Sequence, residues 1–452
     1  MPLIPPLDRN RQTPLYEQIY RYLRAQIENG ALKSEEALPS RRMMAALCGV
    51  STTTVWNAYE QLAAEGYIAA KPKSGTYVEG PERNFTPVTE TGEAPPEENK
   101  PPPVRYDCRF GRIDESAFPH KLWHAHQQAA LRLPEVLQRG DPQGELFLRR
   151  EICGILNRLR GVEADPSAVI IGAGLEWLIL ALLPLFPETA RFGMEDPGYT
   201  PYRKLLDAYG RKTLTVPSGS GAERLYDLQP DILYLQPSHR FPLGGVLPAK
   251  KRQELLQWAG KTGGIILEDD YDSELRYRGL PIQPLQSMDR DGRVVYLGSF
   301  SGSFSPALRI GYMILPPGLE ERRRHTGHPS CPVSVPDQLA LASFIQEGRL
   351  ERHIARMRTL YRRRRERLLE LFKRLEPDVT AEDDGAGLFL RLSLAIPEER
   401  ALTLALEAGV RLTGISQFYE GTGEKTRVLF GYGGLSDDCL PEVTGLLARA
   451  WA

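Results

Sequence analysis

The sequence predicts an α/β protein in which a small N-terminal head precedes a large body built on a doubly wound, mostly parallel sheet. Beyond residue 105, short apolar runs alternate with helical patterns, as in a parallel sheet covered by helices. Two of these runs, Ile265 to Leu267 and Val294 to Leu297, are wholly apolar, as expected for strands buried on both faces. A third run, VII at 169–171, leads through a Gly-rich turn into an apolar helical segment. These patterns place the body in the α/β class.

The composition is that of an ordinary globular protein. The 452 residues suffice for two or three domains, and the formal net charge of −1 gives no overall attraction to nucleic acid. No apolar run approaches the roughly 18 residues of a membrane span, and the start MPLIPPLDRN lacks the pattern of an export signal, so we expect a cytoplasmic chain. The five cysteines lack CxxC spacing, which indicates reduced thiols and no metal site.

Residues 10–80, the head, follow the pattern of a winged helix-turn-helix. Leucines and isoleucines four residues apart mark a first helix from Leu15 that stops at Asn29-Gly30. Ser40 and Ser51 are plausible caps of a second and a third helix, joined by a short turn that contains glycine. The inward positions are expected to be Met44 and Leu47 on the second helix and Val55, Tyr59 and Leu62 on the third. YIAA, KPKSG and TYV predict strand, turn and strand, a β-wing. The alternative is a small module that binds protein or nothing.

The head resembles the DNA-binding domain of GntR-type regulators, through LYEQIY, LPSRR, AYEQLAAEGYI and SGTYV. The resemblance implies a double-stranded DNA operator as partner. Its DNA-binding residues would be Ser40, Arg41 and Arg42 at phosphates, Ser51, Thr52, Thr53 and Thr54 in the major groove, and Lys73 and Gly75 on the wing. Most relatives carry Arg or Asn where this chain has Thr52, Thr53 and Asn57. We therefore expect contacts through hydroxyls and thymine methyls, and a modest affinity per monomer.

Residues 81–104 are expected to form a flexible linker. The segment holds seven prolines and five glutamates with hardly an apolar cluster, so it cannot bury enough surface to fold. Head and body, residues 105–452, should therefore move relative to one another. Two heads on a dimeric body could then reach spaced half-sites on DNA.

Polar side chains follow the two apolar runs of the body at the points where the strands are expected to end. Asp269 and Tyr271 come after the first run, and Ser299 and Ser301 come after the second, with Arg309 beyond a Pro turn. The carboxyl ends of parallel strands meet at one edge of a sheet. An acid, a phenol, hydroxyls and an arginine there suit a phosphorylated ring ligand.

These segments, EDDYDSE and GSFSGSFSPALRIGY, resemble the fold type I aminotransferases that use pyridoxal phosphate, and specifically the MocR-type regulators. The resemblance implies an aminotransferase-like effector and dimerisation domain with a smaller α+β C-terminal subdomain, and a head-to-tail homodimer. It assigns Asp269 to the pyridine nitrogen and Tyr271 to the ring oxygen. Ser299, Ser301 and Arg309 would hold the phosphate.

Two positions depart from the family. Gly302 stands where the family has the lysine that forms a Schiff base with the cofactor, and no lysine occurs in residues 262–372. Glu176 stands where relatives usually have glutamine. A carboxylate beside a phosphate would repel it unless turned away or paired.

The resemblance adds further candidates around the cofactor. Gly174 and Leu175, at a helix start, would approach its phosphate through backbone amides. Tyr199 would stack on the ring, or be a turn tyrosine at a domain edge. His239, in PSHRFPLGG, would contact the ring oxygen, or be a hydrogen-bonded loop histidine. Near the C-terminus, Arg427 or Leu429 would occupy the place of the arginine that holds a ligand carboxylate; Arg427 is the candidate.

The arginine-rich run LERHIARMRTLYRRRRERLLELF has apolar residues at helical spacing. We expect a long helix with a solvated basic face, and a contribution to DNA steering is the alternative.

Two functions compete: a transcription regulator whose body senses a small molecule, and a pyridoxal-phosphate-dependent aminotransferase with an attached DNA-binding head. Transamination needs an amine that captures the cofactor and moves a proton, which Gly302 cannot supply. Three ligand states stay open: noncovalent pyridoxal phosphate, an adduct of it with an amino acid, or another ligand in a reshaped pocket. Gly302 is either natural or an introduced substitution.

Overall fold

The structure of the protein is a computed structural model that describes residues 4–9, 13–71, 74–79, 104–279, 281–326, 329–375, 377–421, 423 and 425–452. The chain divides into two compact units, Met1–Lys100 and Pro101–Ala452. The predicted linker, apart from Val104, and the wing residue Lys73 lie outside the described residues.

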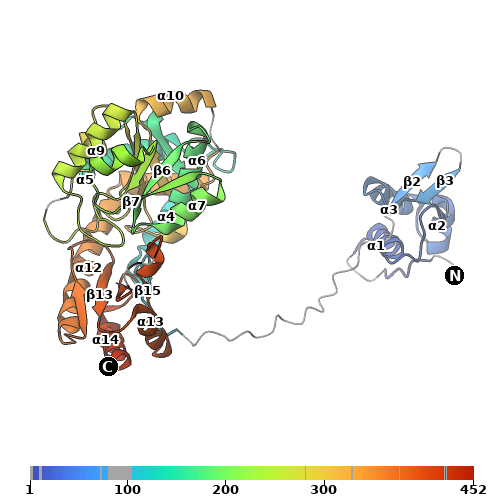
Figure 1. Cartoon of the computed structure of the whole chain (residues 1–452). Helices are drawn as coiled ribbons and strands as arrows, with labels where there is room; N and C mark the ends of the chain where they lie inside the picture. Colours follow the sequence, from blue (N-terminus) through green and yellow to red (C-terminus); the bar gives the residue numbers. More distant parts are fainter. Residues whose placement is uncertain are drawn as a thin grey trace. The chain divides into compact units, whose positions relative to one another are not determined.

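In its described residues the head has three helices and a three-stranded antiparallel sheet of order β1-β3-β2 (Figure 1). Its elements are α1 Leu15–Glu28, β1 Ala37–Leu38, α2 Arg41–Cys48, α3 Thr52–Ala64, β2 Ile68–Lys71 and β3 Gly75–Val78. Ser40 and Ser51 cap α2 and α3 as predicted, because each hydroxyl accepts a hydrogen bond from the backbone N–H three residues on. β1 was not predicted, since two residues are too few for a periodic signal.

The core of the head confirms four of the five predicted inward positions. Met44, Val55, Tyr59 and Leu62 are buried together with residues of α1. Leu47 is a correction, because its side chain is 42% exposed. It lies three residues after Met44 on a helix of only eight residues, and the turn at Gly49 directs the chain away before a wider apolar face can form.

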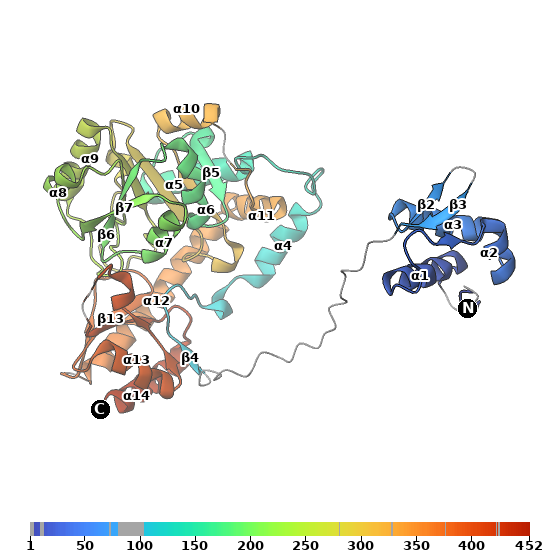
Figure 2. The same cartoon turned by 45° about the vertical axis from the view of Figure 1, so that its right-hand side comes forward.

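The body is built on a seven-stranded sheet of order β5-β11-β10-β9-β8-β6-β7 (Figure 2). β11 pairs antiparallel with both of its neighbours and the other pairs are parallel, so the doubly wound, mostly parallel sheet is confirmed. The strands are β5 Val169–Gly172, β6 Arg191–Asp196, β7 Lys212–Pro217, β8 Ile232–Leu235, β9 Ile265–Asp269, β10 Val294–Ser299 and β11 Gly311–Ile314.

Helices cover both faces of this sheet, and successive side chains along a strand enter different apolar clusters. Val295 and Leu297 of β10 pack with α6, α7 and α10, whereas Val294 and Tyr296 face α5, α8, α9 and α11. The helices are α4 His120–Ala130, α5 Leu146–Arg160, α6 Leu175–Leu182, α7 Thr200–Ala208, α8 Ala222–Leu228, α9 Ala249–Thr262, α10 Pro317–Thr326 and α11 Val335–Gln346. In the described residues no helix has the length and apolar character needed to cross a membrane.

A smaller α+β subdomain completes the body. Its antiparallel sheet has the order β12-β13-β16-β15, and β14 pairs in parallel with β4 from the start of the body. The elements are β4 Tyr106–Asp107, α12 Arg349–Lys373, β12 Val379–Glu382, β13 Phe389–Leu394, α13 Glu398–Glu407, β14 Val410–Arg411, β15 Thr413–Gly414, β16 Arg427–Gly431 and α14 Leu440–Trp451.

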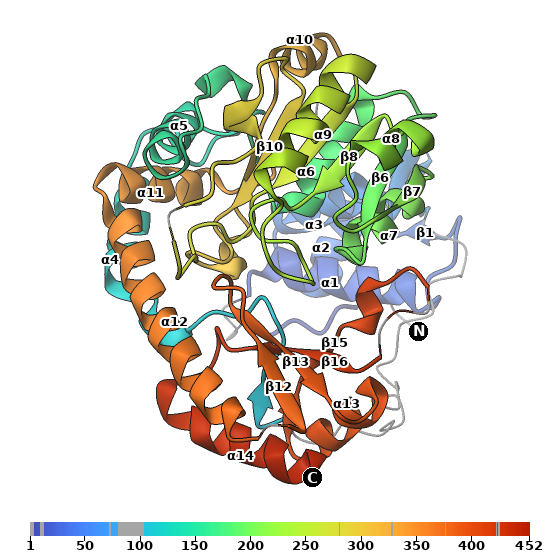
Figure 3. The same cartoon turned by 60° about the vertical axis from the view of Figure 1, so that its left-hand side comes forward.

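The arginine-rich run forms α12, a single helix that runs from the large domain to the smaller subdomain (Figure 3). The long helix is confirmed, and Arg352, Arg356, Arg362, Arg363 and Arg367 form the expected solvated basic face, with two arginines of the run as exceptions. Arg364 and Arg365 are 2% and 1% exposed. Arg364 pairs with Asp114 at 2.8 Å and with Asp437 at 2.9 Å, and Arg365 pairs with Asp383. Burying a guanidinium is costly unless its charge is paired, and each of these carboxylates comes from outside α12.

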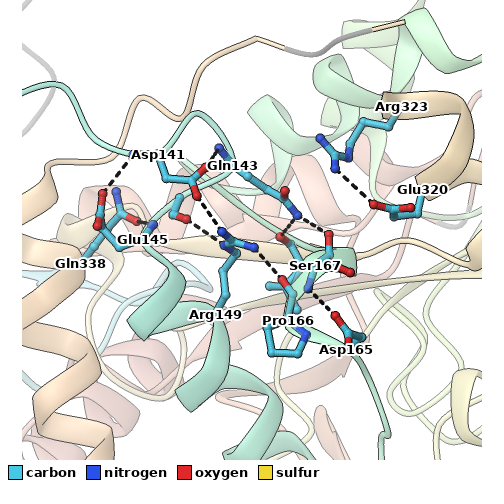
Figure 4. A network of polar contacts seen from close by, with 12 residues as sticks. Asp141, Gln143, Glu145, Arg149, Asp165, Pro166, Ser167, Glu320, Arg323 and Gln338 are labelled. Atoms are coloured by element: carbon cyan, nitrogen blue, oxygen red, sulfur yellow. Dashed lines mark hydrogen bonds and ion pairs between the residues drawn. The ribbon is translucent and has the colours of Figure 1, made fainter. Parts of the chain in front are cut away.

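A polar network fastens the segment before α5 to the start of β5 (Figure 4). The buried guanidinium of Arg149 donates to the carbonyls of Gly144 and Pro166, each at 2.8 Å, and to Asp141 at 2.7 Å. Gln143 donates to the carbonyl of Val169 at 2.6 Å, which ties the loop to the first residue of the strand. β5 is thereby held where its far end opens into the glycine turn of the candidate site.

Candidate functional site

A cavity of about 370 Å³ opens at the carboxyl ends of the body's strands. It lies where β5, β8, β9 and β10 end, and residues of the smaller subdomain close its other side, as ligand sites of open α/β sheets do. Its walls are formed by Phe110, Gly111, Gly174, Leu175, Glu176, Tyr199, Tyr202, Gln236, Phe241, Asp269, Tyr271, Asp272, Ser299, Ser301, Gly302, Pro306, Arg309, Leu388 and Phe389. The structure thus brings together eight of the nine predicted cofactor residues; His239 is the exception.

Asp269, the last residue of β9, is the buried acid of the cavity. Its Oδ2 accepts hydrogen bonds from the hydroxyl of Tyr234 at 2.5 Å and the amide of Gln236 at 2.9 Å. Its Oδ1 has no hydrogen-bond partner among the described residues, although it is buried. Burial raises the pKa of Asp269 to about 7, against the two hydrogen bonds, which lower it. A buried acceptor without a partner is costly, so this oxygen suits a ligand N–H.

Aromatic side chains make the apolar walls. The rings of Tyr199 and Phe241 meet edge to face with centroids 5.8 Å apart, and Phe241 meets Phe389 of β13 at 5.7 Å. Burial raises the pKa of Tyr199 to about 12, so its hydroxyl stays neutral at ordinary pH. Such walls accept a flat ring by stacking.

Arg309 and Glu176 form an ion pair at the edge of the cavity. Arg309 Nη2 lies 2.8 Å from Glu176 Oε2, and the two side chains are 52% and 41% exposed. The pair lies directly over Gly174, which has a φ of +87°. A Cβ on this residue would come within 2.4 Å of Arg309 Nη2. Glu176 was expected either to turn away from the phosphate position or to pair with a cation. It pairs with Arg309, the arginine predicted to hold the phosphate.

The predicted hydroxyl and backbone groups lie close to this pair. Ser299 ends β10, and its hydroxyl accepts a hydrogen bond from the backbone N–H of Ser301 at 3.3 Å. Leu175 is the first residue of α6 and Gly174 precedes it. These residues line the cavity, and their roles toward a ligand stay predictions.

Gly302 lines the same cavity and stands in open space. A Cβ built on it would have one described neighbour within 4 Å, the carbonyl oxygen of Tyr271 at 3.5 Å. The residues that line the cavity, all within the described part of the chain, include no lysine.

His239 does not line the cavity and lies behind its wall. Its Nδ1 lies 2.6 Å from Asp272 and 2.9 Å from the hydroxyl of Tyr271, and its Nε2 lies 3.0 Å from Asp384. Burial opposes the positive charge, but the attraction of Asp272 and the hydrogen bonds to Asp272 and Asp384 raise the pKa of His239 to about 10. The imidazolium therefore joins two carboxylates of different subdomains, and the ring-oxygen contact stays a prediction.

Arg427 also lies outside the cavity lining. It donates a hydrogen bond to Ser393 of the neighbouring β13 at 3.1 Å and pairs with Glu382 of β12, the next strand beyond, at 3.1 Å. Leu429 lies two residues further along β16, on the same face of the strand as Arg427, and is buried beside the cavity aromatics Phe241 and Phe389. Leu429 and not Arg427 therefore lies near the cavity, and the role of Arg427 toward a ligand carboxylate stays a prediction.

The site fits pyridoxal phosphate in part. The free oxygen of Asp269 and the aromatic walls suit its protonated ring nitrogen and flat ring. When bound, this cofactor supplies an aldehyde that captures amines. The chain supplies no lysine in the cavity lining to hold that aldehyde, and Arg309, which was predicted to hold the phosphate, is already paired with Glu176.

Sequence reasoning missed several residues of this site. The parallel register of β8 and β9 pairs Leu235 with Glu268, so Gln236 comes level with Asp269. Locating β8 in the sequence would have predicted this amide. Phe241 and Phe389 carry no local signal, since one lies in a loop and the other on a strand of another subdomain.

Of the predicted DNA-binding residues that the structure describes, all but Thr54 are exposed. Ser40 and Ser51 are exposed while their hydroxyls cap α2 and α3. Arg42, Thr52 and Thr53 are exposed, and Thr54 is half-buried with its hydroxyl 2.8 Å from that of Ser51. Arg41 is exposed and pairs with Glu60 at 3.5 Å, and Gly75 begins β3 with a φ of +129°.

Trp56 was not singled out from the sequence. It projects from the outer side of α3 with 44% of its surface exposed. A tryptophan beside threonines and an asparagine on the exposed side of a helix is the signal that would have found it, because such a ring is normally buried.

Comparisons with known proteins agree with this architecture. Residues 15–78 match bacterial regulatory proteins of the gntR family, and residues 112–438 match aminotransferase class I and II. The HTH-type transcriptional regulator YhdI of Bacillus subtilis is 38% identical over 100% of this chain and 99% of its own length. The HTH-type pyridoxine biosynthesis transcriptional regulator PdxR of Corynebacterium glutamicum is 32% identical over 98% of this chain and 97% of its own.

Solved structures share the fold of the body. Pyrococcus horikoshii kynurenine aminotransferase superposes with a TM-score of 0.67 at 24% identity, covering 78% of this chain and 91% of that one. This likeness shows the fold type I aminotransferase fold. Taken with the two family matches and relatives similar over their full length, it leads to one conclusion: the chain belongs to the family of HTH-type transcriptional regulators in which a gntR-type head precedes an aminotransferase-like domain.

Proposed function

We propose that this regulator holds a small-molecule effector noncovalently in the body cavity, and that occupancy changes the affinity of the head for its operator. One observation carries the proposal. Asp269 leaves a buried acceptor oxygen open inside a cavity whose lining residues, all described, include no lysine. The cavity is therefore able to hold a ring ligand and unable to tether an aldehyde.

The family supplies the first candidate ligand. Pyridoxal phosphate, or its adduct with an amino acid, would place its ring nitrogen at Asp269 between the aromatic walls. That a relative is named for pyridoxine biosynthesis supports a ligand of this chemistry. Another ring compound with an N–H donor is the alternative.

Catalysis is not part of this proposal. Transamination needs an amine that captures the cofactor and shuttles a proton, and Gly302, at the family's lysine position, offers no functional group. Two relatives that match nearly the full chain are named as transcriptional regulators, which supports a role without catalysis. Turnover of pyridoxamine phosphate with a keto acid by the purified chain would contradict it.

The head would contact DNA mainly through α3. Its exposed side offers threonine hydroxyls, the Asn57 amide and the Trp56 ring, and within 52–64 it carries no lysine or arginine. We propose that α3 reads thymine methyls and adenine edges, while Arg41 and Arg42 contact phosphates.

We also propose a homodimer formed through the bodies. Large apolar side chains of α4 and the following loop are exposed: Leu122, Leu131, Leu133 and Leu137, at 42, 54, 48 and 82%. Four exposed leucines within 16 residues of one segment support an interaction surface there. Sedimentation of the full chain should show a dimer, and a monomer at micromolar concentration would contradict it.

The operator tests the function as a whole. Selection from random duplex DNA with the full chain should yield a specific site, and fluorescence anisotropy on that site should then be repeated with a ring ligand present. We expect the ligand to change the operator affinity of the wild type and to leave that of Asp269→Asn unchanged. Equal operator affinity with and without saturating ligand would contradict the sensor.

A further inference from the structure

The charges that line the cavity do not favour a phosphate. Arg309 is the one lysine or arginine among its described lining residues, which also include the acids Glu176, Asp269 and Asp272. The negative charge of Asp272 is neutralised by the imidazolium of His239, which lies behind the cavity wall. The positive charge of Arg309 is neutralised by the carboxylate of Glu176. No positive charge of the lining is left over for a dianion.

The ion pair of Arg309 and Glu176 lies at the place in the cavity where a phosphate was predicted to bind. Gly174 has no side chain, and the space where its Cβ would lie falls 2.4 Å from Arg309 Nη2 and 3.1 Å from Glu176 Oε2. Both groups therefore lie over the turn that begins α6. A phosphate that approached Arg309 there would meet the carboxylate of Glu176 within a few ångströms. It would have to displace this carboxylate or bear its repulsion.

The ring end of the cavity is built differently. Asp269 is 2% exposed, and both donors to it reach Oδ2, so Oδ1 is left for a ligand. This buried oxygen provides recognition of a ring N–H that does not depend on the phosphate end.

From this contrast we propose that Glu176 is a specificity residue. It acts as a built-in counter-ion that cancels the attraction of Arg309 for phosphate, so the cavity takes unphosphorylated nitrogen heterocycles about as well as phosphorylated ones. The inference rests on the proposed function, since it concerns the ligand of the same cavity. Because the pair is about half exposed, solvent screens it, and we expect an effect of about tenfold and not many orders of magnitude.

Pyridoxine and pyridoxine 5′-phosphate are the matched probes, because they differ only in the phosphate and neither carries an aldehyde that reacts with surface lysines. Their dissociation constants for the full-length wild type, from calorimetry at fixed ionic strength, should agree within about threefold. In Glu176→Gln the phosphate ester should bind about tenfold more tightly while pyridoxine is unchanged. Adding Arg309→Gln should abolish that gain, and the exposed Glu188→Gln should behave as wild type.

The possible results distinguish a wrong role for Glu176 from a wrong ligand class for the cavity. A wild type that binds the phosphate ester more than tenfold more tightly than pyridoxine overturns the role of Glu176 and leaves the noncovalent sensor standing. This comparison needs no variant, so it holds even if a substitution impairs folding. Failure of both probes to bind wild type and Glu176→Gln overturns the inference together with the proposed ligand class. Operator binding, measured separately, reports on the regulator itself.

Discussion

Replacing Asp269 with asparagine should remove a pH-dependent loss of stability from the body. Burial raises the pKa of Asp269 from an ordinary 3.8 to about 7. Between these values the folded carboxyl keeps a proton that the unfolded chain has released. Because the folded state then binds more protons, its free energy of unfolding falls as pH rises from about 4 to 7. The full shift corresponds to about 4 kcal/mol, an upper value because ligand or water in the cavity reduces it.

The measurement is urea unfolding of wild type and Asp269→Asn at pH 5, 6, 7 and 8, without ligand. Four of the five tryptophans lie in the body, so fluorescence follows its unfolding. Burial also raises the pKa of Glu268 to about 7, so the wild type alone would mix two carboxyl groups. The difference between wild type and Asp269→Asn isolates Asp269, because the amide keeps the shape and an oxygen for Tyr234 and Gln236.

We expect the asparagine variant to gain stability relative to wild type as pH rises from 5 to 8, by up to about 3 kcal/mol, because only the part of the shift between pH 5 and about 7 falls in this range. Tyr234→Phe is the companion variant. It removes a hydrogen bond that lowers the pKa of Asp269, so the decline should move to higher pH. A difference between wild type and asparagine variant that stays flat across the range would refute the assignment of Asp269 as an uncompensated buried acid.

Three further substitutions test other parts of the structure. Gly302→Lys should create an absorbance band of a Schiff base with pyridoxal phosphate, because a Cβ there has open space; no band would show that the cavity is not arranged as described. Trp56→Ala should weaken operator binding about tenfold, as loss of one apolar base contact does, while the exposed body variant Tyr226→Ala should not. Arg364→Leu should destabilise the body by about 3–5 kcal/mol in urea unfolding, because two carboxylates lose their partner. The exposed Arg362→Leu should cost less than about 1 kcal/mol, and equal losses would contradict the buried network.

Local patterns predicted the elements that carry the site. Apolar runs located β9 and β10, and the polar residues after them line one cavity because parallel strands end at a common edge. Ser40 and Ser51 were identified as caps because capping depends on residues within one turn of the helix. These features are decided by neighbours in sequence, which a single sequence shows.

Features decided by distant residues were not predictable in the same way. The spacing of apolar residues along a helix does not show which charged residues are buried. It therefore could not predict that Arg364 pairs with Asp114 and Asp437 inside the body. The same holds for His239, because Asp384 comes to it from the smaller subdomain. The pairing of Glu176 with Arg309 depends on β11 lying beside β5 in the sheet, a neighbour relation that sequence order does not give.

Titration of the full-length chain with pyridoxal phosphate, followed by dialysis and intact mass, tests the central account most directly. We expect saturable binding with the spectrum of the free aldehyde, complete loss of that spectrum on dialysis, and an unchanged protein mass. A band that resists dialysis, together with a mass increase on one lysine after borohydride reduction, would show a tethering amine in the cavity and contradict noncovalent capture.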